Sequence, residues 1–384
     1  MRTERCDRAV QALRAAERLC AWQTAPAHTG LQTPEEVPVR MTAPVIDVHT
    51  HLLPPQYLDL LRSRSEPPMI VDRGGTEFLV HLPVPSPGPP ADGPGMPVTD
   101  AFWSPDTKIA FMDEAGIDVS VLSLGNPWLD FVTPDEAVSY AASLNAEFEQ
   151  TAASSGGRFF ALGVVPTAAG ADASSSEVDR IAEQPHMRGI ILSTRGFGSG
   201  LDDPAMDAVW AKVVEHELVV FTHPHYGIGN ENYSGYGVSL LISLGFTFET
   251  TVMAARLALS GVFERFPSLS LMLSHAGGTL PFLASRLDAS LSINPALRDL
   301  PEPSGTLKAA ILDSVVYDGD SLRRVLEFGD HDRIVFGTDH PFMIAGADRL
   351  LAALDAAAGD NQELAAAIRG ANAARLYRLG LPAA

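Results

Sequence analysis

The chain has 384 residues, of which 46% are hydrophobic, and this is enough for one large α/β domain or two ordinary ones. Its formal net charge of −20 argues against nucleic acid or an anionic membrane surface as a partner, because both require clustered Lys and Arg. We find no membrane-length apolar run and no signal peptide, and only two cysteines, Cys6 and Cys20, so we expect a cytoplasmic protein without a disulfide framework.

The first 40 residues differ from the rest of the chain. Residues 2–23 are rich in Arg and Ala with apolar residues at helical spacing, and the turn-rich stretch "TAPAHTGLQTPEEVP" follows. We therefore expect a helical extension and linker over residues 1–40 and a single barrel domain over residues 41–384. A natural start at Met41 is the alternative, because a strand follows that residue at once.

Short apolar runs alternate with segments of helical period from Val45 onward, a pattern typical of repeated βα units and a parallel sheet. Eight such runs predict an α/β fold of the (β/α)₈ or TIM-barrel class: 45–51, 117–125, 159–166, 189–194, 218–224, 269–278, 311–318 and 333–341. The segments between them predict helices at 135–154, 203–216, 250–266 and 322–328, with a closing helical stretch over 346–379.

An insertion over residues 74–103 follows the first strand and contains "PVPSPGPPADGPGMP", which is too rich in Pro and Gly for regular structure. We expect it to cover the mouth of the barrel as a lid or as a wall of the substrate pocket. A disordered surface loop is the alternative that composition leaves open.

The first strand ends in "VHTH", and residues i and i+2 of a strand point to one face, so His49 and His51 project together. Alone, such a pair is a weak signal. His223, His275 and Asp339 also lie at strand ends, on the face where a barrel builds its active site. Together these residues predict a metal site with an open coordination position.

These motifs resemble those of the metal-dependent amidohydrolase superfamily, and within it the branch of aminocarboxymuconate-semialdehyde decarboxylase and related aromatic-acid decarboxylases. The resemblance covers residues 45 to about 379 and is carried by "DVHTHLLPP", "WSPDTKIAFMDEAGID", "FTHPH", "LSHAGGTLPFLASRLD" and "IVFGTDHPF". It implies a (β/α)₈ barrel of the metal-dependent hydrolase type. It also implies the metal ligands His49, His51, His223 and Asp339, with His275 as a catalytic acid/base beside the ion.

A single divalent ion is expected. Superfamily members with two metals bridge them by a carboxylated lysine at the end of the fourth strand, and the three lysines of this chain, Lys108, Lys212 and Lys308, all lie elsewhere in the sequence. Imidazole nitrogens with one carboxylate suit Zn²⁺ best, and Mn²⁺ and Fe²⁺ also fit.

The substrate is expected to be a small organic acid. Arg286 matches a position where the family binds a substrate carboxylate across a dimer interface, which makes a homodimer the default, and Arg195 is a replacement anchor. Met96 stands where the family has its first carboxylate-binding Arg, and His225 replaces an aromatic residue. These departures favour a monocarboxylate with an apolar or aromatic body, for which Phe342 is a candidate wall.

The leading hypothesis is therefore a mononuclear, metal-dependent, non-oxidative decarboxylase of an aromatic or unsaturated carboxylic acid. Either the ion activates water to add to a conjugated substrate, or it chelates the substrate while His275 or Asp339 delivers a proton. The second hypothesis is a hydrolase or hydratase of the same superfamily, acting on a lactone, cyclic amide or conjugated acid. A barrel that keeps its metal for structure alone is the third.

Overall fold

The predicted strand runs pair into one parallel sheet in the computed structural model, which describes residues 43–81, 95–229, 232–233, 236 and 239–381. The sheet has eight strands in chain order, each made of a short, almost fully buried run. Their bounds are β1 Ile46–Leu52, β5 Val119–Leu124, β6 Phe159–Val164, β7 Met187–Ser193, β8 Val219–His223, β9 Ser270–Leu273, β10 Ile311–Asp313 and β11 Ile334–Val335.

Backbone hydrogen bonds join the segment after β11 back to β1. Val48 donates its N–H to the carbonyl of Phe336 at 3.1 Å, and His51 donates to the carbonyl of His340 at 2.7 Å. The sheet is thus a nearly closed barrel, and the prediction of a (β/α)₈ fold is confirmed.

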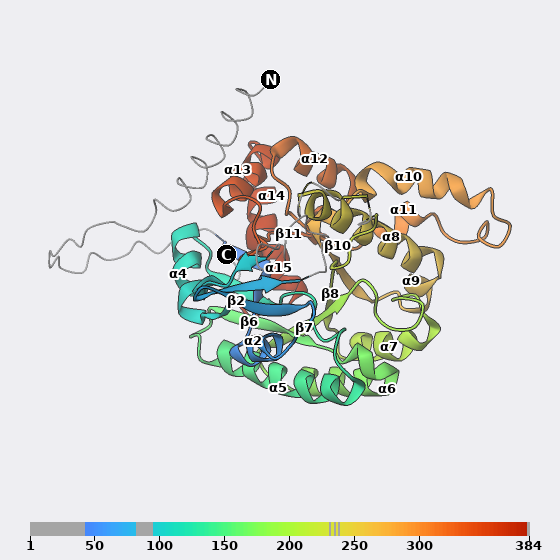
Figure 1. Ribbon diagram of the computed structural model, residues 1–384. Helices are drawn as coiled ribbons and strands as arrows, with labels where there is room; N and C mark the ends of the chain where they lie inside the picture. The colour runs from blue at the N-terminus through green and yellow to red at the C-terminus, as the bar shows by residue number, and fades with distance from the viewer. Residues whose placement is uncertain (1–42, 82–94, 230–231, 234–235, 237–238, 382–384) are drawn as a thin grey trace, which may run out of the picture. The chain divides into compact units, whose positions relative to one another are not determined.

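Helices cover the outside of the barrel, with α5, α6 and α7 along one side and α12 to α15 along another (Figure 1). Local signals set their ends: Thr133 and Glu136 form a capping box at the start of α5, and Gly116, with a φ of 70°, ends α4. The bounds in this layer are α2 Pro55–Arg62, α3 Asp100–Trp103, α4 Pro105–Ala115, α5 Pro134–Ala153, α6 Gly170–Ala182, α7 Asp207–Glu215, α8 Phe246–Leu259, α9 Val262–Arg265, α10 Leu280–Leu291, α11 Pro303–Leu307, α12 Gly319–Phe328, α13 Ala347–Ala358, α14 Gln362–Ala366 and α15 Asn372–Leu376.

Two predicted helices are interrupted. The helix expected over 250–266 breaks at Gly261, whose φ of 75° is left-handed, so α8 and α9 are separate. The stretch expected over 346–379 breaks after α13 at Gly359, with a φ of 58°. Glycine supplies this conformation without a steric penalty, and an α-helix cannot continue through it.

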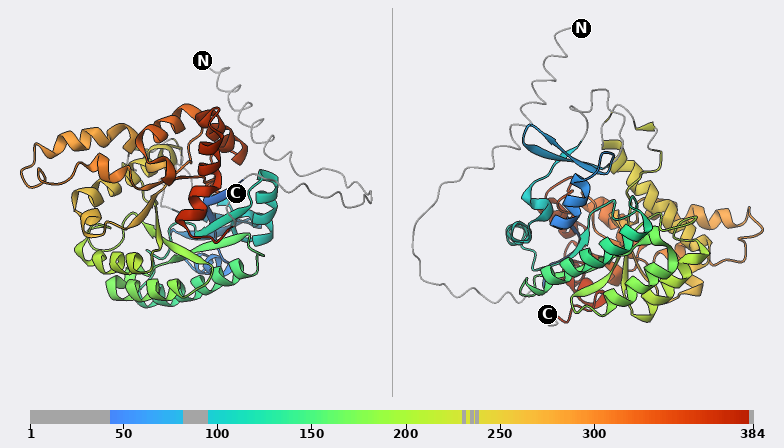
Figure 2. Two further views of the ribbon diagram at one scale, coloured as in Figure 1. Left: turned by 180° about the vertical axis from the view of Figure 1, so that it is seen from behind. Right: turned by 60° about the horizontal axis from the view of Figure 1, so that its bottom comes forward.

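The expectation that the insertion has no regular structure is wrong for its described part. Met69–Arg73 (β2) and Thr76–Val80 (β3) form an antiparallel hairpin to which Met96–Pro97 (β4) adds a third strand. Gly74 and Gly75 form its two-residue loop with φ values of 67° and 90°, as a tight hairpin turn requires. The hairpin stands at one end of the barrel (Figure 2). Most of the proline-rich stretch, and the extension expected over residues 1–40, lie outside the described residues.

Among the described residues, one helical stretch, Leu241–Leu259, has the length and mean hydropathy of a membrane span, although the sequence was expected to hold none. Half of its most apolar window is buried within the protein, and Glu249 and Arg256 lie in it. Ala254 and Leu257 are fully buried in the hydrophobic core, so part of this stretch packs as a helix of the barrel's outer layer.

Candidate metal centre and active site

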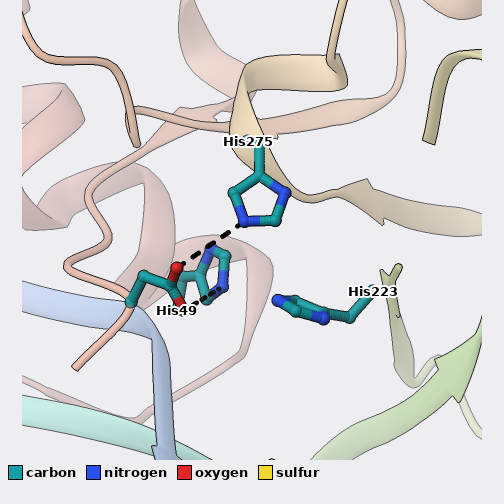
Figure 3. A group of neighbouring side chains, drawn as sticks. His49, His223 and His275 are labelled. Carbon is teal, nitrogen blue, oxygen red and sulfur yellow. Dashed lines mark ion pairs between the residues drawn. The ribbon is translucent and has the colours of Figure 1, made fainter. Parts of the chain in front are cut away.

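Five residues predicted from the strand ends lie together at one end of the barrel. His49 and His51 lie on β1, His223 ends β8, His275 follows β9 and Asp339 follows β11. The ring centroid of His49 lies 5.2, 5.1 and 5.2 Å from those of His51, His223 and His275. Figure 3 shows three of these rings, His49, His223 and His275, pointing toward a common centre.

Besides Nδ1 of His275, four buried atoms in this group have no hydrogen-bond partner within the part of the chain that the structure describes. They are the Nε2 atoms of His49, His51 and His223 and the Oδ1 atom of Asp339. Oδ1 of Asp339 lies 3.3 Å from Nε2 of His49 and 3.3 Å from Nε2 of His51. Buried polar atoms without partners are rare because they are costly. The donor set therefore fits one divalent cation: the ligand atoms of His49, His223 and Asp339 lie within 4.8 Å of one another, and Nε2 of His51 joins them through its contact with Asp339.

The second nitrogen of each of these histidines is held by a hydrogen bond. Nδ1 of His49 lies 2.6 Å from Oδ2 of Asp313, Nδ1 of His51 lies 2.9 Å from Oγ of Ser123, and Nδ1 of His223 lies 2.8 Å from the carbonyl of Pro224. Carbonyl and carboxylate oxygens accept hydrogen bonds, so Nδ1 of His49 and of His223 carries the proton. Nε2 is then left with a free lone pair, which is the form that binds a metal.

Asp313, the last residue of β10, was not predicted as a site residue. Besides His49, its carboxylate accepts the backbone N–H groups of His275 at 2.8 Å and of Ala276 at 2.7 Å. His275 and Ala276 have φ values of 53° and 55°, a backbone conformation that non-glycine residues adopt only where the surroundings impose it. Asp313 thus orients one candidate ligand and holds the strained turn that carries His275. The only sequence signal was its place at the end of the seventh strand.

Burial and the two carboxylates of Asp339 and Asp313 shift the pKa values of the candidate ligands. Burial lowers the pKa of His49, but Asp339 and Asp313 outweigh it and raise the pKa to about 10. Burial raises the pKa of Asp339, and the neighbouring histidines reverse this and hold it well below its usual value. Burial lowers the pKa of His51 to about 4 and that of His223 well below its usual range. Without an ion, the pocket thus combines two ionised carboxylates with neutral imidazoles at His51 and His223 and a protonated His49, whose Nε2 proton a bound cation would displace.

His275 differs from the other three histidines. Its Nε2 lies 3.6 Å from Oδ2 of Asp339, its side chain is 14% exposed, and its Nδ1 has no hydrogen-bond partner among the described residues. It can reach an ion, because its ligand atom lies within 4.8 Å of those of His49, His223 and Asp339. No acceptor fixes its tautomer, however, and it borders the adjoining cavity. An imidazole in this position can exchange a proton with a bound molecule.

A cavity of about 660 Å³ opens beside the candidate ligands. His225 and Phe342, both predicted to contact substrate, line it, and so does His81, to which the sequence assigned no role. The β2–β3 hairpin and the segment after it contribute Leu79, Val80, His81, Gly95 and Met96, so the described part of the insertion does form a pocket wall, as predicted. The described lining residues include no Lys or Arg.

The two predicted arginine anchors lie outside this cavity. The guanidinium of Arg195 lies 3.3 Å from the ring centroid of Tyr226 and lines a second cavity of about 520 Å³. Arg286 lies exposed on α10. Within one chain, the structure therefore brings neither guanidinium to the candidate ligands, and their roles in substrate binding stay predictions.

Lys108 is fully buried behind β1. Its Nζ lies 2.7 Å from Oγ1 of Thr50 and also contacts Nδ1 of His340, whose ring stacks on Phe111 at 3.9 Å between centroids. Lys108 thus braces β1 against the segment that carries Asp339. None of the described residues that line the cavity is a lysine.

Comparison with known proteins identifies the relatives of this chain. A family model described as amidohydrolase matches residues 46–379. The 2-amino-3-carboxymuconate-6-semialdehyde decarboxylase of Dictyostelium discoideum is 26% identical over 302 residues, 77% of this chain and 81% of that protein. A gamma-resorcylate decarboxylase of a Rhizobium species is 29% identical over 258 residues, 62% of this chain and 76% of that protein.

The solved structures include a similar protein. The apo crystal structure of Metarhizium anisopliae IDCase is 34% identical and superposes with a TM-score of 0.83, covering 88% of this chain and 98% of that one. The match extends over nearly the whole of that protein, so the two chains share the fold of the barrel.

Proposed function

The chain belongs to the amidohydrolase family, and we propose that it is a metal-dependent, non-oxidative decarboxylase of an aromatic or unsaturated carboxylic acid. One observation carries this proposal. Four unpartnered buried atoms, the Nε2 atoms of His49, His51 and His223 and Oδ1 of Asp339, converge beside a cavity of about 660 Å³ that His275 borders. The two curated relatives described above are both named as decarboxylases.

The proposed cofactor is one divalent ion, held by His49, His51, His223 and Asp339. Zn²⁺ is the first choice for this donor set, with Mn²⁺ and Fe²⁺ as alternatives. When bound, such an ion supplies positive charge that attracts a carboxylate and a neighbouring oxygen and stabilises negative charge that develops on the substrate.

His275 is the proposed proton donor. When CO₂ leaves, an electron pair remains on carbon, and a positioned acid must supply a proton there. His275 borders the cavity, and its turn is held by Asp313, so its imidazole faces a bound acid. Asp339, whose Oδ2 lies 3.6 Å from Nε2 of His275, is the alternative proton donor, but the lowered pKa that keeps its carboxylate ionised favours His275. Phe342 and His225 are the proposed substrate contacts, and the apolar part of the wall excludes water.

We further propose a homodimer in the cytoplasm. Leu244, Phe248 and Val252 are 41%, 37% and 44% exposed, and their spacing of four residues places them on one face of the same helical stretch. A second copy of the chain would cover this apolar face. Because Arg286 is exposed in one chain, a partner subunit is also the means by which this guanidinium would reach a neighbouring cavity.

A substrate panel tests the proposed reaction. Protein loaded with Zn²⁺, Mn²⁺ or Fe²⁺ is incubated with hydroxybenzoates, aminobenzoates and unsaturated diacids, and with lactones and cyclic amides. Release of CO₂ and loss of the ring carboxylate are followed by mass spectrometry. Metal-dependent CO₂ release supports the decarboxylase. Ring opening or hydration without CO₂ supports the alternative hydrolase or hydratase, which would use the same ligands with water as the nucleophile.

A further inference from the structure

Two histidines of the cavity wall take no part in the candidate metal group. His81 follows β3 of the hairpin, and His225 follows β8. Their ring centroids lie 6.2 Å apart with an angle of 56° between the planes. The ring of Phe342 contacts both His81 and the candidate ligand His51, with 5.6 Å between centroids in each case. The histidine pair therefore lies one aromatic ring away from the candidate metal centre.

The two rings carry unused hydrogen-bonding atoms. Both nitrogens of His81 and Nδ1 of His225 are buried and lack a hydrogen-bond partner within the described part of the chain. A neutral imidazole offers one donor and one acceptor. Buried polar atoms of this kind are normally paired, so their pairing with a bound molecule or water is expected.

Within one chain, the charges around the pair disfavour a second carboxylate. The described residues that line the cavity provide no Lys or Arg, whereas Asp318 and Asp339 both contribute to the lining. Burial lowers the pKa of His81 to about 4, and the nearby backbone of Asn126 opposes this only in part, so His81 is uncharged at neutral pH. A buried anion without a cationic partner is strongly disfavoured.

We propose that His81 and His225 form a specificity site for a neutral hydroxyl group on the substrate ring, remote from the carboxylate that reacts. A hydroxyl group can accept a hydrogen bond from one imidazole and donate one to the other. Two hydrogen bonds of about 2.8 Å each to one oxygen suit rings at this separation. The assignment rests on the proposed function for the identity of the reacting carboxylate. It also assigns a function to the β2–β3 hairpin, because this hairpin places His81 in the cavity wall.

Binding measurements test the specificity site separately from the reaction. The Kd values of benzoate, 3-hydroxybenzoate, 4-hydroxybenzoate, 3-methoxybenzoate and terephthalate are measured by calorimetry on the full-length protein loaded with Zn²⁺. At least one hydroxybenzoate is expected to bind about 10- to 100-fold more tightly than benzoate, since the buried nitrogens are then paired. The methoxy compound, which cannot donate, and terephthalate, which carries a second carboxylate, are expected to lose this advantage.

Variants assign the effect to the pair. His81→Phe and His225→Phe are expected to reduce the affinity for the preferred hydroxybenzoate to about the wild-type affinity for benzoate. Bound Zn²⁺ and the circular dichroism spectrum report that the metal site and the fold are intact. His81→Asn, which keeps a donor and an acceptor, should restore part of the preference. His186→Phe, at a histidine paired with Glu149, is the control and should keep the wild-type values.

Three outcomes would overturn the assignment. These are equal losses for benzoate and hydroxybenzoate in His81→Phe, terephthalate binding as tightly as the best hydroxybenzoate, or no difference between benzoate and either hydroxybenzoate in the wild type. Failure of the decarboxylase proposal is a separate result, because it appears as absent CO₂ release whatever the order of the Kd values.

Discussion

The carboxylate of Asp313 lies 2.6 Å from Nδ1 of His49 and, through the same Oδ2 atom, accepts the backbone N–H of His275 at 2.8 Å. One buried side chain on β10 therefore holds both a candidate metal ligand on β1 and the proposed proton donor after β9. The two halves of the site are coupled through Asp313, and changes to this residue should affect both.

Asp313→Asn tests this coupling. An asparagine of nearly the same shape removes the negative charge that favours Nδ1–H on His49. The affinity for Zn²⁺ is expected to fall by about 10- to 100-fold, as is usual when the partner of a metal-binding histidine is changed. Competition with a chromophoric chelator measures the change. The exposed Asp330→Asn is the matched control, and an unchanged affinity in Asp313→Asn would show that Asp313 does not tune the site.

His275 and His223 should separate proton delivery from metal binding. His275→Asn is expected to reduce turnover by about 10²- to 10⁴-fold, the usual contribution of a positioned acid, with the bound metal retained. His223→Asn removes one of the unpartnered Nε2 atoms and should lose the metal as well. Metal content by mass spectrometry and CO₂ release are measured on the same samples. Loss of metal in His275→Asn would make His275 a ligand instead.

Sequence patterns predicted the fold and the candidate site residues that the structure brings together, because the two-residue period of a strand and the location of strand ends are local features. His49 and His51 illustrate this. Asp313 and His81 were missed in the sequence for different reasons. Asp313 is a single acidic residue at a strand end, and no neighbouring sequence feature indicates that it pairs with His49, which lies 264 residues away. The position of His81 depends on the β2–β3 hairpin. The Gly-Gly turn of this hairpin is present in the sequence, but it was interpreted as part of an irregular insertion.

The direction of an exposed or loop side chain was not predictable either. Arg195 follows β7 directly, as expected, but its guanidinium stacks on Tyr226 and faces a different cavity. This orientation depends on the conformation of two loops that are distant in sequence. Lys108 was considered in the sequence only as a lysine too far from the fourth strand to bridge two metals, and only the structure reveals that its amine is buried beside Thr50.

Lys108 should give the stability a pH dependence. Burial lowers its pKa to about 7, with Asp47 and Asp339 opposing the shift in part, whereas the unfolded chain keeps the ordinary value of 10.5. Between these values the unfolded state binds more protons than the folded state, so a rise in pH disfavours unfolding. The free energy of unfolding of the wild type should therefore increase from pH 7 to 10 relative to Lys108→Met.

Urea denaturation at pH 7 and pH 9.5 measures this difference, and the exposed Lys308→Met serves as the control for loss of a lysine. A gap between wild type and Lys108→Met that is the same at both pH values would contradict the assignment of an uncharged amine above pH 7.

Arg286 tests the proposed dimer. Arg286→Ala is expected to raise KM for an anionic substrate by about tenfold, which corresponds to about 1.4 kcal/mol, with little change in kcat. If Arg286 serves the cavity of the partner subunit, mixing Arg286→Ala with His275→Asn should restore one intact site in each mixed dimer. Steady-state kinetics after subunit exchange reports this recovery. An unchanged KM would remove Arg286 from the site, and no recovery on mixing would restrict its action to its own chain.

One ion, bound where His49, His51, His223 and Asp339 converge, is proposed to be required for CO₂ release. The most direct test is a titration of metal-free protein with Zn²⁺, Mn²⁺ or Fe²⁺ while CO₂ release from the best acid of the panel is recorded. We expect no activity without metal and a linear rise that ends at one equivalent per chain. Activity in the metal-free protein, or a rise that continues to two equivalents, would contradict the account.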